Sequence, residues 1–526
     1  MTTPAAGAGH GNGGRRPLVF NAFLTNSLSH IHHGTWRHPA SRQMAYTDLD
    51  LWTDLARALE KGRFDAIFFA DTLGLFDQHR GGWKTSVRQA LQIPSGDPIV
   101  LISALAAATT DLGFVATSSI LHEHPFTFAR RASTLDHITK GRFGWNIVPS
   151  TRRHEARNFG LDDIPPHDER YAWAEEYTEV VYALWEHSWE DDAVLGDREG
   201  GRYMDADKVH AIGHRGPRYR VEGPHMAEPS PQRTPVLFQA GSSEAGRSFA
   251  ARHAEATFIA AHDPASAAEV VADVRRRAAA GGRRAADILF IQGLTFVIGS
   301  TEAEARANSA EVDEWLSDEG MLAHMSGTIG VDLSAIDLER PISDFTTDRV
   351  QGVVRSLAES APDKSKTFGE LARWAWSQRV VGTPDQIADQ LEQWSAAGVD
   401  GVNVIYITLP GTYVDFMEHV APVLRDRGLM QCEYRPGTLR EKLFPGRGAR
   451  LPESHVARRL RLPPDDDGAD DHRAGDDRAG DDRAGDDRAG DDRAGDDRAG
   501  GGPNAEVAPD GLPGGGPQVK VTEHAS

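Results

Sequence analysis

The sequence predicts an α/β fold, a (β/α)8 TIM barrel with insertions. Strand-like and helix-like segments alternate over roughly 400 residues, as repeated strand-helix units require. Most of the strand-like runs are continuously apolar, which is typical of parallel strands covered on both faces. A doubly wound sheet is disfavoured, because Phe23 leads into Leu24-Thr25-Asn26 and offers no glycine-rich turn for a dinucleotide pyrophosphate.

Eight barrel strands are expected, each a short apolar run. The fourth, for example, opens after Lys140-Gly141 and closes on Pro149. The strands are expected at 18–23, 66–71, 112–117, 143–148, 236–240, 256–260, 288–298 and 402–407.

The segments between the strands carry apolar residues at helical spacing. Helices are expected over 49–59, 99–108, 126–138 and 171–185. Two additions interrupt the repeat, a Gly- and Pro-punctuated segment at 190–233 and a less periodic one at about 303–375. Insertions of this size on a barrel usually become lids or binding loops.

Both ends of the chain are predicted to be disordered extensions of one barrel domain. We expect 1–16 as an N-terminal extension, 17–462 as the barrel domain and 463–526 as an acidic low-complexity tail. In the tail the unit Asp-Asp-Arg-Ala-Gly runs five times over 476–500, with almost no apolar surface to offset the entropy of ordering. The tail is either a solvated extension without a partner or an interaction tail.

Composition narrows the class of protein. The net charge is −21, but residues 465–500 hold 15 Asp and 6 Arg, which leaves about −12 for the rest. Such an acidic body lacks the basic face that nucleic acid requires, so a small organic ligand is expected. No stretch approaches the ~20 apolar residues of a membrane span, and residues 1–16 lack the apolar core of a secretory signal. The single cysteine, Cys432, excludes an internal disulfide and fits a cytoplasmic protein.

Polar residues follow the expected strands at their carboxyl ends, the edge that carries function in TIM barrels. Asp71 ends the second strand, Thr117 the third and Asn146 lies in the fourth. After the fifth, Gly241-Ser242-Ser243 runs directly into a helix, whose free N–H groups and two hydroxyls are a suitable phosphate site. An ordinary serine N-cap is the alternative for these serines.

A series of short motifs recurs in order from about residue 17 to 445. They are Asn21-Ala22-Phe23, Trp36-Arg37-His38-Pro39, Phe68-Phe69-Ala70-Asp71, Ala116-Thr117-Ser118-Ser119, the segment 129–137, Trp145-Asn146-Ile147-Val148, Asn158-Phe159-Gly160, His167 with Arg170-Tyr171, and Gln239-Ala240-Gly241-Ser242-Ser243. This series resembles the bacterial luciferase-like flavin monooxygenases. Within them it is similar to the branch of nitrilotriacetate monooxygenase component A and dibenzothiophene-sulfone monooxygenase.

The resemblance implies a two-component, FMN-dependent monooxygenase. A separate NAD(P)H:flavin reductase would supply reduced FMN, which this chain would bind and react with O2 to a flavin C4a-(hydro)peroxide. One oxygen atom would pass to a small organic substrate such as an aminopolycarboxylate, an organosulfur compound or an alkyl or aromatic xenobiotic. Relatives of this kind are usually homo-oligomers.

The resemblance also implies which residues contact FMN. At matching positions these are Asp71, Thr117, Asn146, His167, Tyr171, Ser242 and Ser243. The two serines would bind the phosphate, and Asn146 would lie near the isoalloxazine ring together with Gln239. No residue is assigned as acid or base, and no metal site is expected. Each contact has a structural alternative; Asp71, for instance, could cap its loop.

The chain departs from the family pattern beside the third and fourth strands. Ile120-Leu121 and Pro149 stand where the family has threonines, and His122 stands where it has a tyrosine. We expect these changes to alter the wall of the substrate pocket. The substrate could be anionic or apolar, because the candidate pocket residues are of both kinds: Trp36, Arg37, Trp83 and Arg152.

The sequence leaves other chemistries on the same fold open. His30-Ile31-His32-His33 has the His-x-His spacing that places two imidazoles on a metal in amidohydrolase-type barrels, and His262-Asp263 could add ligands. Against this, Thr117 and Asn146 occupy strand ends where such a hydrolase needs a bridging Lys or His. A barrel that binds flavin without catalysis, and use of a deazaflavin, are further alternatives.

Overall fold

The computed structural model describes residues 16–241, 243–341, 367–376 and 378–461. The predicted extension 1–16 lies outside these residues apart from Arg16, and the predicted tail 463–526 lies outside them entirely. Disorder at both ends therefore stays a prediction. Ser242, one of the two expected phosphate ligands, also lies outside the described residues.

Eight parallel strands form a closed barrel, in the order β1-β14-β11-β10-β9-β4-β3-β2 around the ring. They are β1 (Val19–Leu24), β2 (Ala66–Phe69), β3 (Gly113–Ser119), β4 (Phe143–Val148), β9 (Val236–Ala240), β10 (Ala256–Ile259), β11 (Leu289–Leu294) and β14 (Gly401–Ile405). The first and last strands pair from Val19 with Gly401 to Phe23 with Ile405, which closes the sheet. The predicted barrel is confirmed, and closure excludes the doubly wound alternative.

The expected strand 288–298 is wrong as a single element. The barrel strand β11 ends at Leu294, and β12 (Phe296–Ile298) pairs with β13 (Val380–Gly382) in a separate two-stranded sheet. Phe296 packs against Phe416 with 5.2 Å between ring centroids. A continuous apolar run has no period that would locate this break at Thr295.

Helices follow the strands, and the longer ones cover the outside of the barrel. They are α1 (Leu49–Lys61), α2 (Lys84–Arg88), α3 (Pro98–Ala108), α4 (Pro125–Ile138), α5 (Arg153–Asn158), α6 (His167–Tyr182), α7 (Glu244–His253), α8 (Pro264–Ala280), α13 (Pro384–Ala396), α14 (Gly411–Asp415), α15 (Ala421–Asp426), α16 (Leu439–Leu443) and α17 (Val456–Arg459). The four expected helices are present, but α6 begins at His167 instead of residue 171. Among the described residues, no helix has both the length and the apolar character to cross a membrane.

Several helix starts are fixed by a capping side chain followed by proline. Asp97 precedes Pro98 of α3, Asp263 precedes Pro264 of α8, and in each case the carboxylate accepts a hydrogen bond from a free N–H of the first turn. Such a cap satisfies a donor that has no partner within the helix, and proline lacks the N–H that would go unpaired. These local signals set where each crossover begins.

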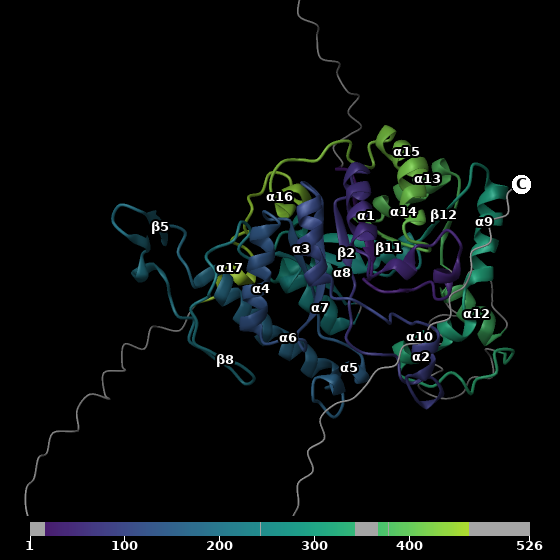
Figure 1. The fold of residues 1–526 in the computed structure, drawn as a ribbon, viewed down its shortest axis with the longest axis horizontal. Helices are drawn as coiled ribbons and strands as arrows, with labels where there is room; N and C mark the ends of the chain where they lie inside the picture. Colours follow the sequence, from purple (N-terminus) through teal and green to yellow (C-terminus); the bar gives the residue numbers. More distant parts are fainter. Residues whose placement is uncertain (1–15, 242, 342–366, 377, 462–526) are drawn as a thin grey trace, which may run out of the picture. The chain divides into compact units, whose positions relative to one another are not determined.

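The two insertions differ in structure. Segment 190–233 forms two hairpins, β5 (Val194–Asp197) with β6 (Arg202–Met204) and β7 (His214–Arg215) with β8 (Arg220–Val221); the first stands away from the barrel in Figure 1. The described part of 303–375 is mainly helical, with α9 (Glu302–Trp315), α10 (Asp318–Ile329) and α12 (Phe368–Trp376).

Aromatic side chains fill the inside of the barrel. Phe68 lies 5.3 Å from Phe23 and 5.5 Å from Phe238 between ring centroids, and Phe258 lies 5.1 Å from Phe23. Leucines of α16 join the same cluster from the amino-terminal end of the strands. Because this interior is packed, we expect the active site above the carboxyl ends of the strands and not inside the barrel.

Candidate functional site

Thr117 and Asn146 lie side by side on the rim, as predicted. They are register partners on β3 and β4, and the Asn146 Nδ2 donates to Thr117 Oγ1 over 2.8 Å. Thr117 in turn donates to the Phe69 carbonyl over 2.9 Å. Asn146 Oδ1 is buried and has no hydrogen-bond partner within the described residues. A buried acceptor without a partner is costly, so it fits the polar edge of a bound planar ligand.

Three of the expected flavin contacts meet at the start of α7. Ser243 caps this helix by accepting from Gly246 N over 3.1 Å, and its Oγ lies 2.9 Å from Nε2 of His167. The Tyr171 ring lies 5.0 Å from the His167 ring and 5.7 Å from that of Phe249. The N-cap alternative for Ser243 is therefore correct, yet the same hydroxyl also faces two residues of α6. A helix N-terminus with this donor set can hold a phosphate.

Glycines allow the close approach of Tyr171 to this turn. A Cβ on Gly246 would lie 2.7 Å from the Tyr171 hydroxyl oxygen, and one on Gly241 would lie 3.0 Å from it. Both distances are shorter than ordinary van der Waals contacts. A side chain at either position would therefore displace a neighbouring atom, and only glycine fits without such a displacement. The sequence contains these glycines, but nothing in it shows that they face Tyr171.

Asp71 lies in a different group from the phosphate residues. Burial raises the pKa of Asp71 to about 6, and the nearby His122 opposes that rise. His122 Nε2 lies 2.7 Å from Glu155 Oε1, and the same oxygen accepts from Leu73 N over 3.2 Å. Ser150 Oγ donates to Ser119 Oγ over 2.5 Å beside this pair. Glu155 is the partner that the sequence did not reveal for His122.

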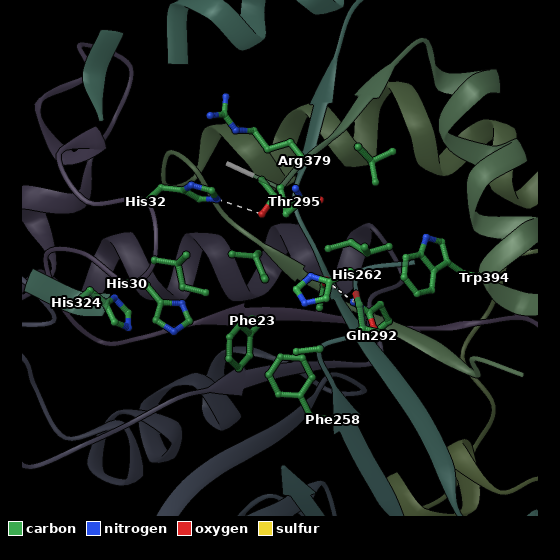
Figure 2. Close-up of a pocket in the computed structure, with 18 of the residues that line it drawn as sticks. Phe23, His30, His32, Phe258, His262, Gln292, Thr295, His324, Arg379 and Trp394 are labelled. Carbon is green, nitrogen blue, oxygen red and sulfur yellow. Dashed lines mark hydrogen bonds between the residues drawn. The ribbon is translucent and has the colours of Figure 1, made fainter. Parts of the chain in front are cut away.

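A cavity of about 710 Å³ opens above the other half of the barrel, over β10, β11, β14 and β1 (Figure 2). Its apolar walls are Phe23, Phe258, Leu294, Val380, Trp394 and Ile405. Its polar walls include His30, His32, His262, Gln292, Thr295, His324 and Arg379. The residues expected to contact flavin do not line it. They follow strands on the other side of the rim, where β9 pairs with β10 through Ala240 and Phe258.

The histidines of the loop after β1 are buried and uncharged near neutral pH. Burial lowers the pKa of His30 to about 3, and burial followed by the charge of Arg379 lowers the pKa of His32 to about 3. His32 Nε2 lies 3.1 Å from Thr295 Oγ1, at the break between β11 and β12. The Nδ1 atoms of both rings have no hydrogen-bond partner within the described residues. The cavity thus offers neutral hydrogen-bonding groups to a ligand.

Arg379 is a cavity arginine whose charge already has a partner. Its side chain is 2% exposed and forms an ion pair with Asp313, which is 57% exposed. Its Nη1 also donates to the Ser309 carbonyl over 3.0 Å, while Nε is buried with no partner in the described chain. Asp313 therefore neutralises the guanidinium in the cavity wall.

Helix α10 of the second insertion closes one side of the cavity. Ser317, its N-cap, donates its backbone N–H to the His33 carbonyl over 2.9 Å, and His33 Nε2 lies 2.7 Å from His324 Nδ1. Gln89 Nε2 donates to Glu319 Oε2 over 2.8 Å beside this contact. The expectation that this insertion forms part of a binding site agrees with these contacts.

The residues expected to shape the pocket do not line the cavity. Arg37 donates to the Trp315 carbonyl over 2.7 Å, and Trp83 is 47% exposed on the surface. Arg152 lies over Phe76, 3.9 Å from the ring centroid, and donates to the cavity residue Gln92 over 2.6 Å. Trp36, His122 and Pro149 are likewise absent from its walls, and Ile120 and Leu121 join the core between barrel and helices.

The histidines of the first loop do not form a metal site of the hydrolase type. Among the described residues, no group of three or more His, Cys, Asp or Glu side chains is arranged to hold a metal ion. His32 contacts Thr295, and His33 contacts His324. The structure therefore gives no support to the amidohydrolase alternative.

Comparison with known proteins agrees with this geometry. The family model described as luciferase-like monooxygenase matches residues 27–401. The chain belongs to this family. It is a flavin-dependent monooxygenase, and the resemblance stated from its motifs is confirmed.

This chain aligns with nearly the whole length of individual relatives. The long-chain alkane monooxygenase of Geobacillus thermodenitrificans is 46% identical over 447 residues, 85% of this chain and 98% of the relative. The dimethyl-sulfide monooxygenase of Hyphomicrobium sulfonivorans is 42% identical over 452 residues, 85% and 94%. Nitrilotriacetate monooxygenase component A of Aminobacter aminovorans is 34% identical over 442 residues, 82% and 96%.

One solved structure bears directly on the cofactor. A riboflavin lyase, crystallised with modified FMN and its substrate riboflavin, superposes with a TM-score of 0.77 at 38% identity, covering 84% of this chain and 99% of that one. The residues on this chain's rim fit a flavin, because Asn146 Oδ1 lacks a partner and the α7 start combines Ser243, His167 and Tyr171.

Proposed function

We propose that the chain is the oxygenase component of a two-component system that uses reduced FMN and O2. A separate NAD(P)H:flavin reductase would supply the reduced flavin; the nitrilotriacetate relative is itself named as one component, component A, of its enzyme. The observation that carries the proposal is a rim with an unpaired buried amide oxygen at Asn146, on a barrel that also holds a cavity of about 710 Å³ over β10, β11, β14 and β1. When bound, the flavin supplies the oxygen-activating chemistry.

The chain's own residues bind and orient the cofactor in this proposal. His167, Tyr171, Ser242 and Ser243 hold the phosphate at the positive end of α7. Thr117 fixes the amide of Asn146 by accepting from its Nδ2, so that Oδ1 points to a ring donor. Asp71 adds a carboxyl at the same edge. Aromatic walls keep water from the reacting centre, which protects a reactive intermediate.

The cavity favours a largely apolar substrate with few charges. Its buried histidines His30 and His32 are neutral at neutral pH, and its arginine Arg379 is paired with Asp313, so several carboxylates would find few counter-charges there. Trp394, Phe258 and Ile405 instead provide apolar surface. We therefore propose an alkyl, aromatic or organosulfur compound, and consider an aminopolycarboxylate unsuitable.

Flavin binding and oxygenation can be measured separately. Anaerobic titration of the purified chain should show binding of reduced FMN, and addition of reductase, NADH and ¹⁸O2 should place labelled oxygen in an accepted substrate. The panel should pair each apolar compound with an isosteric polycarboxylate. Absence of reduced-FMN binding, or oxygenation confined to the polycarboxylates, would contradict the corresponding part of the proposal.

We also propose a homo-oligomer that works in the cytoplasm. NAD(P)H, the reductant of the proposed partner, is an intracellular compound, and exposed apolar side chains on the first hairpin, such as Tyr203 at 59% and Met204 at 45%, offer surface for a second copy. Light scattering of the full chain measures the assembly. A monomer at micromolar concentration would contradict it.

A further inference from the structure

We infer that Ser29 and His33 are positioning residues that hold His324 in one tautomer, with Nδ1 protonated and Nε2 as the acceptor nitrogen of a ring in the cavity wall. The three side chains come from two distant parts of the chain, the loop after β1 and helix α10. They form a continuous series of hydrogen bonds, buried between Ser29 and His33 and partly buried between His33 and His324.

The series starts at Ser29, whose hydroxyl has one hydrogen. That hydrogen goes to the Ala90 carbonyl, which can only accept. The same oxygen accepts from Gln92 N over 3.2 Å and lies 3.2 Å from His33 Nδ1. Since its only hydrogen is already donated, Ser29 must accept from His33. His33 therefore carries its proton on Nδ1.

The tautomer of His33 determines that of His324. With its proton on Nδ1, a neutral His33 has a bare lone pair on Nε2, 2.7 Å from His324 Nδ1. Burial lowers the pKa of His33 to about 3 and that of His324 well below its ordinary value, so both rings are neutral at neutral pH. His324 Nδ1 must then be the donor, which makes Nε2 its acceptor nitrogen.

The surroundings fix the orientation of the His324 ring. It packs on Phe76 with 4.3 Å between ring centroids, and the Arg152 guanidinium lies 3.9 Å from the centroid of Phe76. The ring lines the cavity near His30 in Figure 2. An acceptor held there recognises a ligand that offers an O–H or N–H, and a donor held there would recognise a carbonyl.

The tautomer can be measured without flavin or turnover. In the full chain with ¹⁵N-labelled histidine, the nitrogen signals lost in His324→Gln identify this ring. Protonated and bare imidazole nitrogens differ widely in ¹⁵N shift. We expect Nδ1 protonated and Nε2 bare in the wild type, and a mixture in Ser29→Ala, where His33 loses its acceptor.

Replacements of His33 separate positioning from packing. His33→Gln places an amide oxygen that can still accept from His324 Nδ1, so the His324 tautomer should persist. His33→Phe removes the acceptor, so both tautomers of His324 should appear. A protonated Nε2 in the wild type would overturn the inference, as would unchanged signals in both Ser29→Ala and His33→Phe. If His33→Phe does not fold, Ser29→Ala decides alone.

The effect on turnover rests on the proposed function. We expect Ser29→Ala to lower kcat/KM by about tenfold for a substrate with a hydrogen-bond donor, and His33→Gln to restore most of that loss relative to His33→Phe. Binding of reduced FMN should stay within about twofold. A wild type with the expected tautomer but no oxygenation would reject the proposed function alone, and equal losses for substrates with and without the donor would reject the role in recognition.

Discussion

The two halves of the barrel rim are built in different ways. On the β2–β3–β4–β9 side, polar groups such as Thr117 and Asn146 come from strand ends and contact their neighbours in register. On the β10–β11–β14–β1 side, the cavity combines aromatic side chains with neutral buried histidines, and one wall comes from α10 in an insertion. We propose that the first half binds the flavin and that the second binds the substrate.

This difference follows from how each half is held. Neighbouring strands fix the Thr117–Asn146 contact through the ladder itself. The cavity wall depends on docking over long sequence separations, as between His33 and His324. Variants in the two halves should therefore separate flavin binding from substrate selection.

The largest expected effect is on the flavin half. Replacing Ser242 and Ser243 together by Ala should weaken reduced-FMN binding by about 1.5–3 kcal/mol, because charge-assisted hydrogen bonds to the phosphate are lost. Anaerobic titration measures the change. Thr301→Ala is the matched control, since Thr301 caps α9 in the same way by accepting from Glu304 N over 3.2 Å. Equal flavin affinity in the double variant and this control would contradict the phosphate assignment.

The glycine turn beside Tyr171 gives the next effect. Gly246→Ala should cost about 1–3 kcal/mol of unfolding free energy and also weaken flavin binding, because its Cβ would lie 2.7 Å from the Tyr171 hydroxyl oxygen. Adding Tyr171→Phe should recover part of the stability without restoring flavin affinity. Gly448→Ala, with no atom within 4 Å of its Cβ, is the control. Denaturant melts that fail to separate Gly246→Ala from Gly448→Ala would show that Tyr171 moves freely.

A smaller effect is expected on substrate choice in the cavity. Asp313→Asn leaves the buried charge of Arg379 without its ionic partner, so the ratio of kcat/KM for a monocarboxylate to that for its neutral isostere should rise about fivefold. Reduced-FMN affinity should not change. Asp318→Asn is the control, because Asp318 pairs with the exposed Arg373 and not with a cavity residue. The same ratio in both variants would remove Arg379 from substrate selection.

The smallest expected effect is on the pH dependence of stability, which should have opposite signs for Asp71 in one half and His30 in the other. The pKa of Asp71 is raised to about 6, so its stability contribution is present below about pH 4 and is lost as pH rises through 6. The pKa of His30 is lowered to about 3, so its contribution is present above about pH 6.5 and is lost as pH falls toward 3.

Melting temperatures between pH 4 and 8 measure both signs. Asp71→Asn should gain stability relative to the wild type as pH rises through 6, and His30→Gln should gain as pH falls below 6.5. Asp48→Asn, at the exposed start of α1, serves as a control for a surface carboxylate. Parallel pH curves for the wild type and both variants would show that these groups do not set the pH response of the two halves.

The sequence located the rim residues of the β2–β3–β4–β9 side better than the residues of the cavity. Thr117, Asn146, Tyr171 and Ser243 stand in motifs next to strand or helix ends, where local patterning is informative. His324 and Arg379 stand in or beside a weakly periodic insertion, and no local signal connects them to the loop after β1. Trp83 and Arg37 were expected near the substrate from their residue types alone, and both lie away from the cavity. Residue type without a local pattern does not predict such a position.

By itself the sequence determined the barrel, the family and the positions of the rim motifs, because apolar periodicity, capping residues and short motifs are local properties of the chain. Only the tertiary structure decided that the run 288–298 breaks at Thr295, that Glu155 pairs with His122, and that His33 meets His324. Each of these depends on contacts between segments far apart in sequence, for which burial and hydrogen-bond geometry exist only after the chain has packed.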